Sequence, residues 1–276
     1  MSLLTIRNLS LSIHGLQILR NVSMEVAPGR ILGVIGESGS GKSITAFSVL
    51  QLLPGGASCT GSINLSGKDI LSLSEAEMCG LRGRDVGMVF QEPMTALNPL
   101  KTIGDQVAET ILIHERVSKA EAMVRASDAL QRAELPQEKF PLSRYPHELS
   151  GGQRQRVVIA MAIALKPKLL IADEPTTALD VTTQAQILEL LKRLVAEDGM
   201  GLMLISHDLA VVADLADDLV IMRQGEVVES GPAKTLFGNL QHPYSRALLE
   251  ASAHVPERGN ETLEQPYSRA LLEASA

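Results

Sequence analysis

The chain has 276 residues, 45% of them hydrophobic, which suits one large α/β domain with smaller added parts but not two such domains. Its net charge of −7 argues against nucleic acid as a partner, because nucleic-acid-binding surfaces carry a basic excess. No run approaches the roughly 18 apolar residues of a membrane-spanning helix, and no secretory signal opens the chain, so we expect a cytoplasmic protein. Cys59 and Cys79 fit no metal-binding or disulfide pattern.

Short apolar runs in the first third predict an antiparallel layer of strands that leads into a core strand. The expected strands cover 3–13, 22–26 and, after a Pro28-Gly29 turn, Ile31–Ile35. A helix is expected over 44–53. Later strands are expected over 62–65, 85–90, 168–172, 201–206 and 219–222, with helical patterns between several of them. Strands alternating with helices predict a mainly parallel sheet.

The middle of the chain changes to a helical pattern without strands between Thr102 and Arg132. Ser118 and Glu121 have the spacing of a capping box that opens one of these helices. We therefore expect an inserted helical subdomain over about 92–149. Further on, apolar residues recur at helical spacing and predict the buried face of a helix that covers the sheet: Ile187, Leu190, Leu191 and Leu194.

One segment of eleven residues, PYSRALLEASA, occurs twice, at 243–253 and again at 266–276. Two copies of so short a segment cannot form a solenoid. We interpret the repeat as a recent duplication or an artefact.

A glycine-rich segment lies between the predicted strand at Ile31–Ile35 and the predicted helix at 44–53, which is the context of a P-loop. Glycines let the backbone amides and the helix N-terminus face phosphate groups. Lys42 would supply a cation to the β and γ phosphates, and the Ser43 hydroxyl a ligand to Mg²⁺. The predicted nucleotide-binding residues are Gly36, Glu37, Ser38, Gly39, Ser40, Gly41, Lys42, Ser43 and Ile44.

Two carboxylates, Asp173 and Glu174, follow an apolar strand, at the end of a sheet where α/β proteins hold their ligands. We expect Asp173 to hold Mg²⁺ and Glu174 to polarise the water that attacks the γ-phosphate. Gln91 and His207 also follow predicted strands. Gln91 could touch both Mg²⁺ and that water, and His207 could donate a hydrogen bond to the γ-phosphate, although either residue can equally be structural.

The segment Leu149-Ser-Gly-Gly-Gln153 predicts a second anion-binding helix N-terminus in the same chain. With the P-loop, Gln91, the acidic pair, Ala178-Leu-Asp180 and His207 in this order, the sequence resembles the ABC ATPase family. The resemblance covers about residues 1–250 and leaves a short tail over 251–276. It implies an α/β P-loop fold with an N-terminal antiparallel layer and the helical insert, and an ATP-hydrolysing enzyme that uses ATP and Mg²⁺.

In that family two cassettes pack head to tail, as a homodimer or a heterodimer. The resemblance implies that the signature closes on the γ-phosphate held by the other cassette, and that Asp180 lies in a loop between the two sites. The signature residues are Ser150, Gly151, Gly152 and Gln153. Family members stack adenine on an early aromatic residue, whereas this chain has none from Leu11 to Leu19, which leaves His14 or Ile13 as the candidates.

Further segments resemble the bacterial subfamily of dipeptide, oligopeptide and nickel importers: FQEPMTALNP at 90–99, YPHELS at 145–150 and HPYSRAL at 242–248. We expect a di- or oligopeptide importer at the inner face of the bacterial membrane, with nickel import or a soluble, non-transport ABC ATPase as alternatives. The implied partners are a second cassette, two permease subunits and, indirectly, a substrate-binding protein. The insert would receive a permease helix, with 91–98 as the lever. No cysteine follows Cys79, so we expect no metal cluster in the tail.

Overall fold

The computed structural model describes residues 2–91, 96–177, 179–209, 212 and 215–253. The chain divides into two compact units. The first comprises residues 1–71 and 203–276, and the second comprises 72–202. The second copy of the repeated segment, Ala178 and residues 92–95 of the predicted lever lie outside the described residues.

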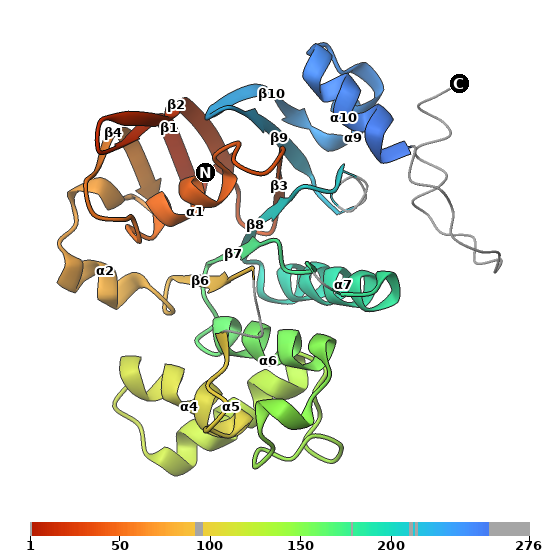
Figure 1. Ribbon diagram of the computed structural model, residues 1–276. Coiled ribbons are helices and arrows are strands. Elements are labelled where there is room, and N and C mark those ends of the chain that lie inside the picture. Colours follow the sequence, from red (N-terminus) through yellow and green to blue (C-terminus); the bar gives the residue numbers. More distant parts are fainter. Residues whose placement is uncertain (1, 92–95, 178, 210–211, 213–214, 254–276) are drawn as a thin grey trace. The chain divides into compact units, whose positions relative to one another are not determined.

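The first unit begins with the predicted antiparallel layer, drawn in red and orange in Figure 1. Its strand order is β2-β1-β4-β5, and β1 pairs antiparallel with both β2 and β4. The strands are β1 (Leu4–Ile13), β2 (Leu16–Val26), β4 (Ala57–Leu65) and β5 (Lys68–Asp69), followed by a 3-10 turn, η1 (Ile70–Ser72). The antiparallel layer is therefore confirmed, and β2 begins six residues before the predicted strand.

Strand β1 shows how its sequence fixes the buried face. Leu4 and Ile6 are buried at a spacing of two, and so are Leu9 and Leu11. The two pairs are out of phase by one residue, and the pairing register with β2 shifts between them. Asn8 takes a left-handed backbone conformation (φ 50) at this irregularity. The bulge therefore returns all four side chains to the core.

The first unit also holds the strands around the glycine-rich loop, in the order β10-β9-β3-β8. β3 (Ile31–Ile35) pairs parallel with β9 (Asp218–Arg223), and β10 (Glu226–Pro232) pairs antiparallel with β9. The remaining elements of this unit are α1 (Lys42–Val49), residues 203–206 of β8 (Gly201–Ser206), α9 (Ala233–Leu236), η3 (Phe237–Asn239) and α10 (Pro243–Ala253). Helix α10 is the first copy of the repeated segment.

The second unit contains the predicted helical region, coloured yellow to green in Figure 1. Here β6 (Val86–Val89) pairs parallel with β7 (Leu169–Asp173). The other elements are α2 (Glu75–Leu81), α4 (Ile103–His114), α5 (Lys119–Arg132), η2 (Pro146–Glu148), α6 (Gly151–Ile163) and α7 (Val181–Asp198). The absence of strands between Thr102 and Arg132 is confirmed, whereas the boundaries of a subdomain at 92–149 stay a prediction.

Two predictions about helices can be compared with side-chain contacts in this unit. At the start of α5, Ser118 Oγ accepts a hydrogen bond from the Glu121 amide at 3.2 Å, so the predicted cap is present. The described contacts do not include the reciprocal bond of a capping box. In α7 the four predicted core residues Ile187, Leu190, Leu191 and Leu194 are each at most 1% exposed, as expected.

Within the described ranges, no helix has the length and apolar character needed to cross a bilayer.

Candidate nucleotide site

The glycine-rich loop of the first unit connects β3 to α1, so the predicted order of strand, loop and helix is confirmed. Two of its glycines are required by the fold. A Cβ atom on Gly36 would lie 2.2 Å from the carbonyl oxygen of Met222. Gly41 precedes α1 with a left-handed backbone (φ 104), and a Cβ there would lie 2.6 Å from Leu19 Cδ2. Any other residue would push the loop away from these neighbours.

The side chain of Lys42 is held inside this loop. It is 4% exposed, and its ammonium group donates hydrogen bonds to the carbonyl oxygens of Gly36 at 2.6 Å and Glu37 at 2.9 Å. In the described part of the chain, the buried hydroxyl of Ser40 has no hydrogen-bond partner. Ser43 lies in the first turn of α1 and is half-buried. A buried cation and an unsatisfied hydroxyl at a helix N-terminus fit an acceptor-rich anion such as a phosphate chain.

In the second unit, the structure brings together two of the predicted hydrolysis residues, Gln91 and Glu174. Gln91 Nε2 donates a hydrogen bond to Glu174 Oε2 at 3.0 Å, and the Thr177 hydroxyl donates to the same oxygen at 3.0 Å. Asp173 ends β7 and is 3% exposed. Glu174 has a left-handed backbone (φ 47), a conformation that costs a non-glycine residue energy and is concentrated at functional sites. Sequence reasoning missed Thr177, which belongs to none of the recognised motifs.

The signature segment opens α6 as predicted, and the helix starts at Gly151 with Ser150 as its N-cap. Ser150 and Gln153 form a capping box, in which the Ser150 amide donates to Gln153 Oε1 at 2.9 Å and Ser150 Oγ accepts from the Gln153 amide at 3.3 Å. Ser150 and Gly151 are exposed. The box holds the first turn of α6 in place, which leaves this helix N-terminus available to an anion.

Asp180 is connected to the signature through Thr183. Asp180 caps α7, where it accepts the Thr183 amide at 2.9 Å and the Thr183 hydroxyl at 2.7 Å. The pKa of Asp180 lies below its ordinary value, chiefly because the carboxylate accepts the hydrogen bond of the Thr183 amide and, as the next largest cause, that of the Thr183 hydroxyl. These bonds fix the Thr183 side chain, whose methyl group would lie 2.4 Å from a Cβ atom on Gly152. Gly152 therefore permits close packing of α6 against the start of α7.

Gly152→Ala is expected to lower the free energy of unfolding by about 1–3 kcal/mol, because the added methyl group overlaps a threonine that its hydrogen bonds prevent from turning. Gly151→Ala is the matched control. A Cβ on Gly151 meets Leu179 Cδ2 at an ordinary 3.5 Å. Denaturant unfolding of both variants measures the difference, and equal stabilities would contradict this packing argument.

The two predicted histidines belong to the first unit. His14 lies in the turn between β1 and β2, where its amide donates to the carbonyl oxygen of Gly56 at 3.1 Å. Its ring packs on Gly56, since a Cβ there would lie 2.4 Å from His14 Cε1. His207 directly follows β8 and is exposed. Two roles stay predictions: adenine stacking by His14 and a hydrogen bond from His207 to the γ-phosphate.

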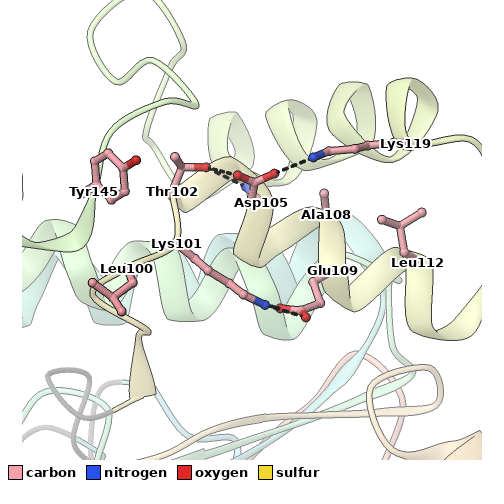
Figure 2. A pocket seen from close by; sticks show the side chains of 9 residues that line it. All are labelled: Leu100, Lys101, Thr102, Asp105, Ala108, Glu109, Leu112, Lys119 and Tyr145. Atoms are coloured by element: carbon pink, nitrogen blue, oxygen red, sulfur yellow. Dashed lines mark hydrogen bonds and ion pairs between the residues drawn. The ribbon is translucent and has the colours of Figure 1, made fainter.

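A cavity of about 380 Å³ lies along α4 in the second unit (Figure 2). Two ion pairs line it, Lys101 Nζ with Glu109 at 2.7 Å and Lys119 Nζ with Asp105 at 3.2 Å. Leu100 is 85% exposed at one side of the cavity. The cavity therefore combines an exposed apolar side chain with charges of both signs, and sequence reasoning assigned none of these residues.

A glycine loop that enters a helix with a buried lysine, and an acidic pair at the end of a buried strand, define a P-loop nucleotide-binding protein. The profile of the ABC transporter family matches residues 19–177, more than half of the chain. The chain therefore belongs to the ABC transporter family.

Curated relatives include importer components. The chain is 50% identical over 247 residues to the glutathione import ATP-binding protein GsiA of Escherichia coli K12, a match that covers 87% of this chain and 39% of that protein. It is 49% identical over 249 residues to a Brucella melitensis protein provisionally named a peptide import ATP-binding protein, with 88% and 73% covered. The chain thus spans less than half the length of GsiA.

Solved structures of cassettes confirm the fold. A dimeric ATP-binding cassette in a post-hydrolysis state with ADP and Pi matches with a TM-score of 0.72 and 30% identity, covering 83% of this chain and 98% of that one. CbiO1 of Clostridium perfringens, part of an ABC transporter complex, matches with a TM-score of 0.77 and 27% identity, covering 90% and 99%.

Proposed function

We propose that this chain is the ATP-hydrolysing cassette that energises a bacterial importer of glutathione-like or other small peptides. The observation that carries the enzymatic part is the 3.0 Å hydrogen bond from Gln91 to Glu174. A module that only bound nucleotide would not need a carboxylate aligned by an amide and by the Thr177 hydroxyl. The names of the relatives support peptide import over nickel import.

In this proposal the loop residues from Gly36 to Ile44 bind the phosphates of ATP. Lys42 neutralises their charge, and its burial strengthens this attraction because little water screens it. Ser43, Gln91 and Asp173 would hold Mg²⁺, because hydroxyl, amide and carboxylate oxygens are the ligands that this ion prefers. When bound, the ion supplies positive charge that stabilises the phosphoryl group during transfer.

Glu174 would act as the general base of hydrolysis. Its carboxylate accepts the proton of a water that attacks the γ-phosphate, while Gln91 and Thr177 keep the carboxylate oriented. His207 would donate a hydrogen bond to the γ-phosphate. The products are ADP and inorganic phosphate, which is also the ligand pair of one of the structural relatives.

The signature would act on the ATP of a second cassette. Its helix N-terminus is held open by the capping box of Ser150 and Gln153, and the loop with Asp180 is tied to it through Thr183. The dimeric state of a structural relative supports a pair of cassettes as the active unit. Two permease subunits at the cytoplasmic face of the inner membrane would complete the transporter, with a cytoplasmic helix of the permease docked in the cavity along α4.

The purified chain is expected to release phosphate from ATP only with Mg²⁺, at a rate per cassette that rises with protein concentration, because two chains form each site. A rate per cassette that is independent of concentration would contradict the shared site.

The importer role is tested by affinity purification from native membranes, where we expect two integral membrane proteins to be retained. A partner set without membrane proteins would contradict that role.

A further inference from the structure

The nucleotide loop has a contact with the C-terminal helix of the described chain. The backbone amide of Glu37 donates a hydrogen bond to the hydroxyl oxygen of Tyr244 at 3.0 Å. Glu37 is the second residue of the glycine-rich loop, and Tyr244 is the second residue of α10, so 207 residues separate the two. Both residues belong to the first unit.

This amide belongs to the same peptide group as the carbonyl of Gly36. That carbonyl accepts a hydrogen bond from the Lys42 ammonium at 2.6 Å. Because a peptide group is planar, holding its N–H also fixes the direction of its C=O. Hydrogen bonds at the two ends of one peptide group also strengthen each other by polarisation. Tyr244 and Lys42 are therefore coupled through one rigid peptide group.

Tyr244 itself is firmly placed. Its side chain is 7% exposed and packs in an apolar cluster with Ile221 of β9 and Leu240. The guanidinium carbon of Arg223 lies 4.9 Å from the centre of its ring, within the range of a cation–π contact. Burial raises the pKa of Tyr244, so the phenol keeps its proton at physiological pH.

The start of α10 is anchored as well. The carboxylate of Glu229, on β10, accepts the amides of Gln241 at 2.7 Å and His242 at 3.3 Å. His242 Nδ1 in turn accepts the Tyr244 amide at 3.1 Å. Figure 1 shows α9 and α10 beside β10 in blue. The backbone at Tyr244 is thus held by β10, while its side chain reaches the nucleotide loop.

We infer that Tyr244 is a positioning residue for the nucleotide site, which fixes the Gly36–Glu37 peptide group and thereby orients Lys42 toward phosphate. This inference rests on the proposed function for the role of Lys42. It makes α10 a part of the nucleotide site, so that ATP affinity depends on the docking of the C-terminal helix. A preorganised lysine binds more tightly because less ordering is left to the moment of binding.

Tyr244→Phe removes only the hydroxyl and keeps the ring in its cluster. Tyr267→Phe is a matched control, since Tyr267 has the same place in the second copy of the repeated segment, outside the described residues. The full chain is titrated calorimetrically with a non-hydrolysable ATP analogue and Mg²⁺. Tyr244→Phe is expected to raise Kd by about 3- to 10-fold, the equivalent of one neutral hydrogen bond, and Tyr267→Phe to leave it unchanged.

Steady-state hydrolysis and thermal unfolding separate positioning from a general structural role. For Tyr244→Phe we expect KM for ATP to rise with Kd, while kcat and Tm stay near the wild-type values. An unchanged or lower Kd would overturn the inference. A fall in Tm large enough for unfolding to explain the loss of ATP affinity would overturn it as well. An effect of Tyr267→Phe without one of Tyr244→Phe would also overturn it. A wild-type chain without affinity for the analogue would instead contradict the proposed function itself.

Discussion

Glu174→Gln is expected to lower kcat for ATP hydrolysis by about 10²- to 10⁴-fold, the usual contribution of a general base. Glutamine keeps the size of the side chain and can still accept the hydrogen bonds that Gln91 and Thr177 donate to Glu174 Oε2. It cannot take a proton from water. Binding of ATP should therefore persist, and phosphate release under single-turnover conditions measures the loss directly.

Glu189→Gln is the control for this substitution. Glu189 lies on α7 in the same unit, is exposed, and undergoes the same chemical change. We expect wild-type turnover for this control. If Glu174→Gln also hydrolysed ATP at the wild-type rate, the base would have to be another residue.

Lys42→Ala is expected to raise Kd for ATP by about 10- to 100-fold, because it removes charge-assisted hydrogen bonds to the phosphates, each of which contributes about 1.5–3 kcal/mol. The effect should appear in binding itself rather than only in turnover. Equilibrium titration with ATP and Mg²⁺ measures it.

Lys68→Ala provides the comparison, since Lys68 is an exposed lysine of the same unit on β5. It should bind ATP as the wild type does. Retained affinity in Lys42→Ala would refute the assignment of Lys42 to the phosphates and, with it, the role of Tyr244.

Much of the fold could be predicted because the core strands are continuous apolar runs. β3 and β8 match the predicted bounds residue for residue, and every residue in both strands is buried. β10 was not predicted. None of the residues of this strand, EVVESGP, is buried, and the strand ends in proline. Neither alternation nor a continuous apolar run therefore identifies it. It forms because β9 offers an edge to pair with.

The candidate site, like the fold, could be predicted only in part from the sequence. The glycine loop, the acidic pair and the signature have fixed local spacings, which a sequence displays directly. The contacts that orient these segments have no fixed local spacing. Tyr244 is 207 residues from Glu37, and Thr183 acts on Gly152 through the shape of its methyl group. Such contacts depend on tertiary packing, which no local pattern records.

Size-exclusion chromatography with light scattering on Glu174→Gln tests the central claim, that two cassettes clamp ATP between them. Without nucleotide we expect the 29.6 kDa mass of the single chain. With excess ATP and Mg²⁺ we expect that mass to double, because the variant binds ATP without consuming it. A single-chain mass at saturating ATP would contradict the claim that the signature at Ser150–Gln153 closes on the nucleotide of a second cassette.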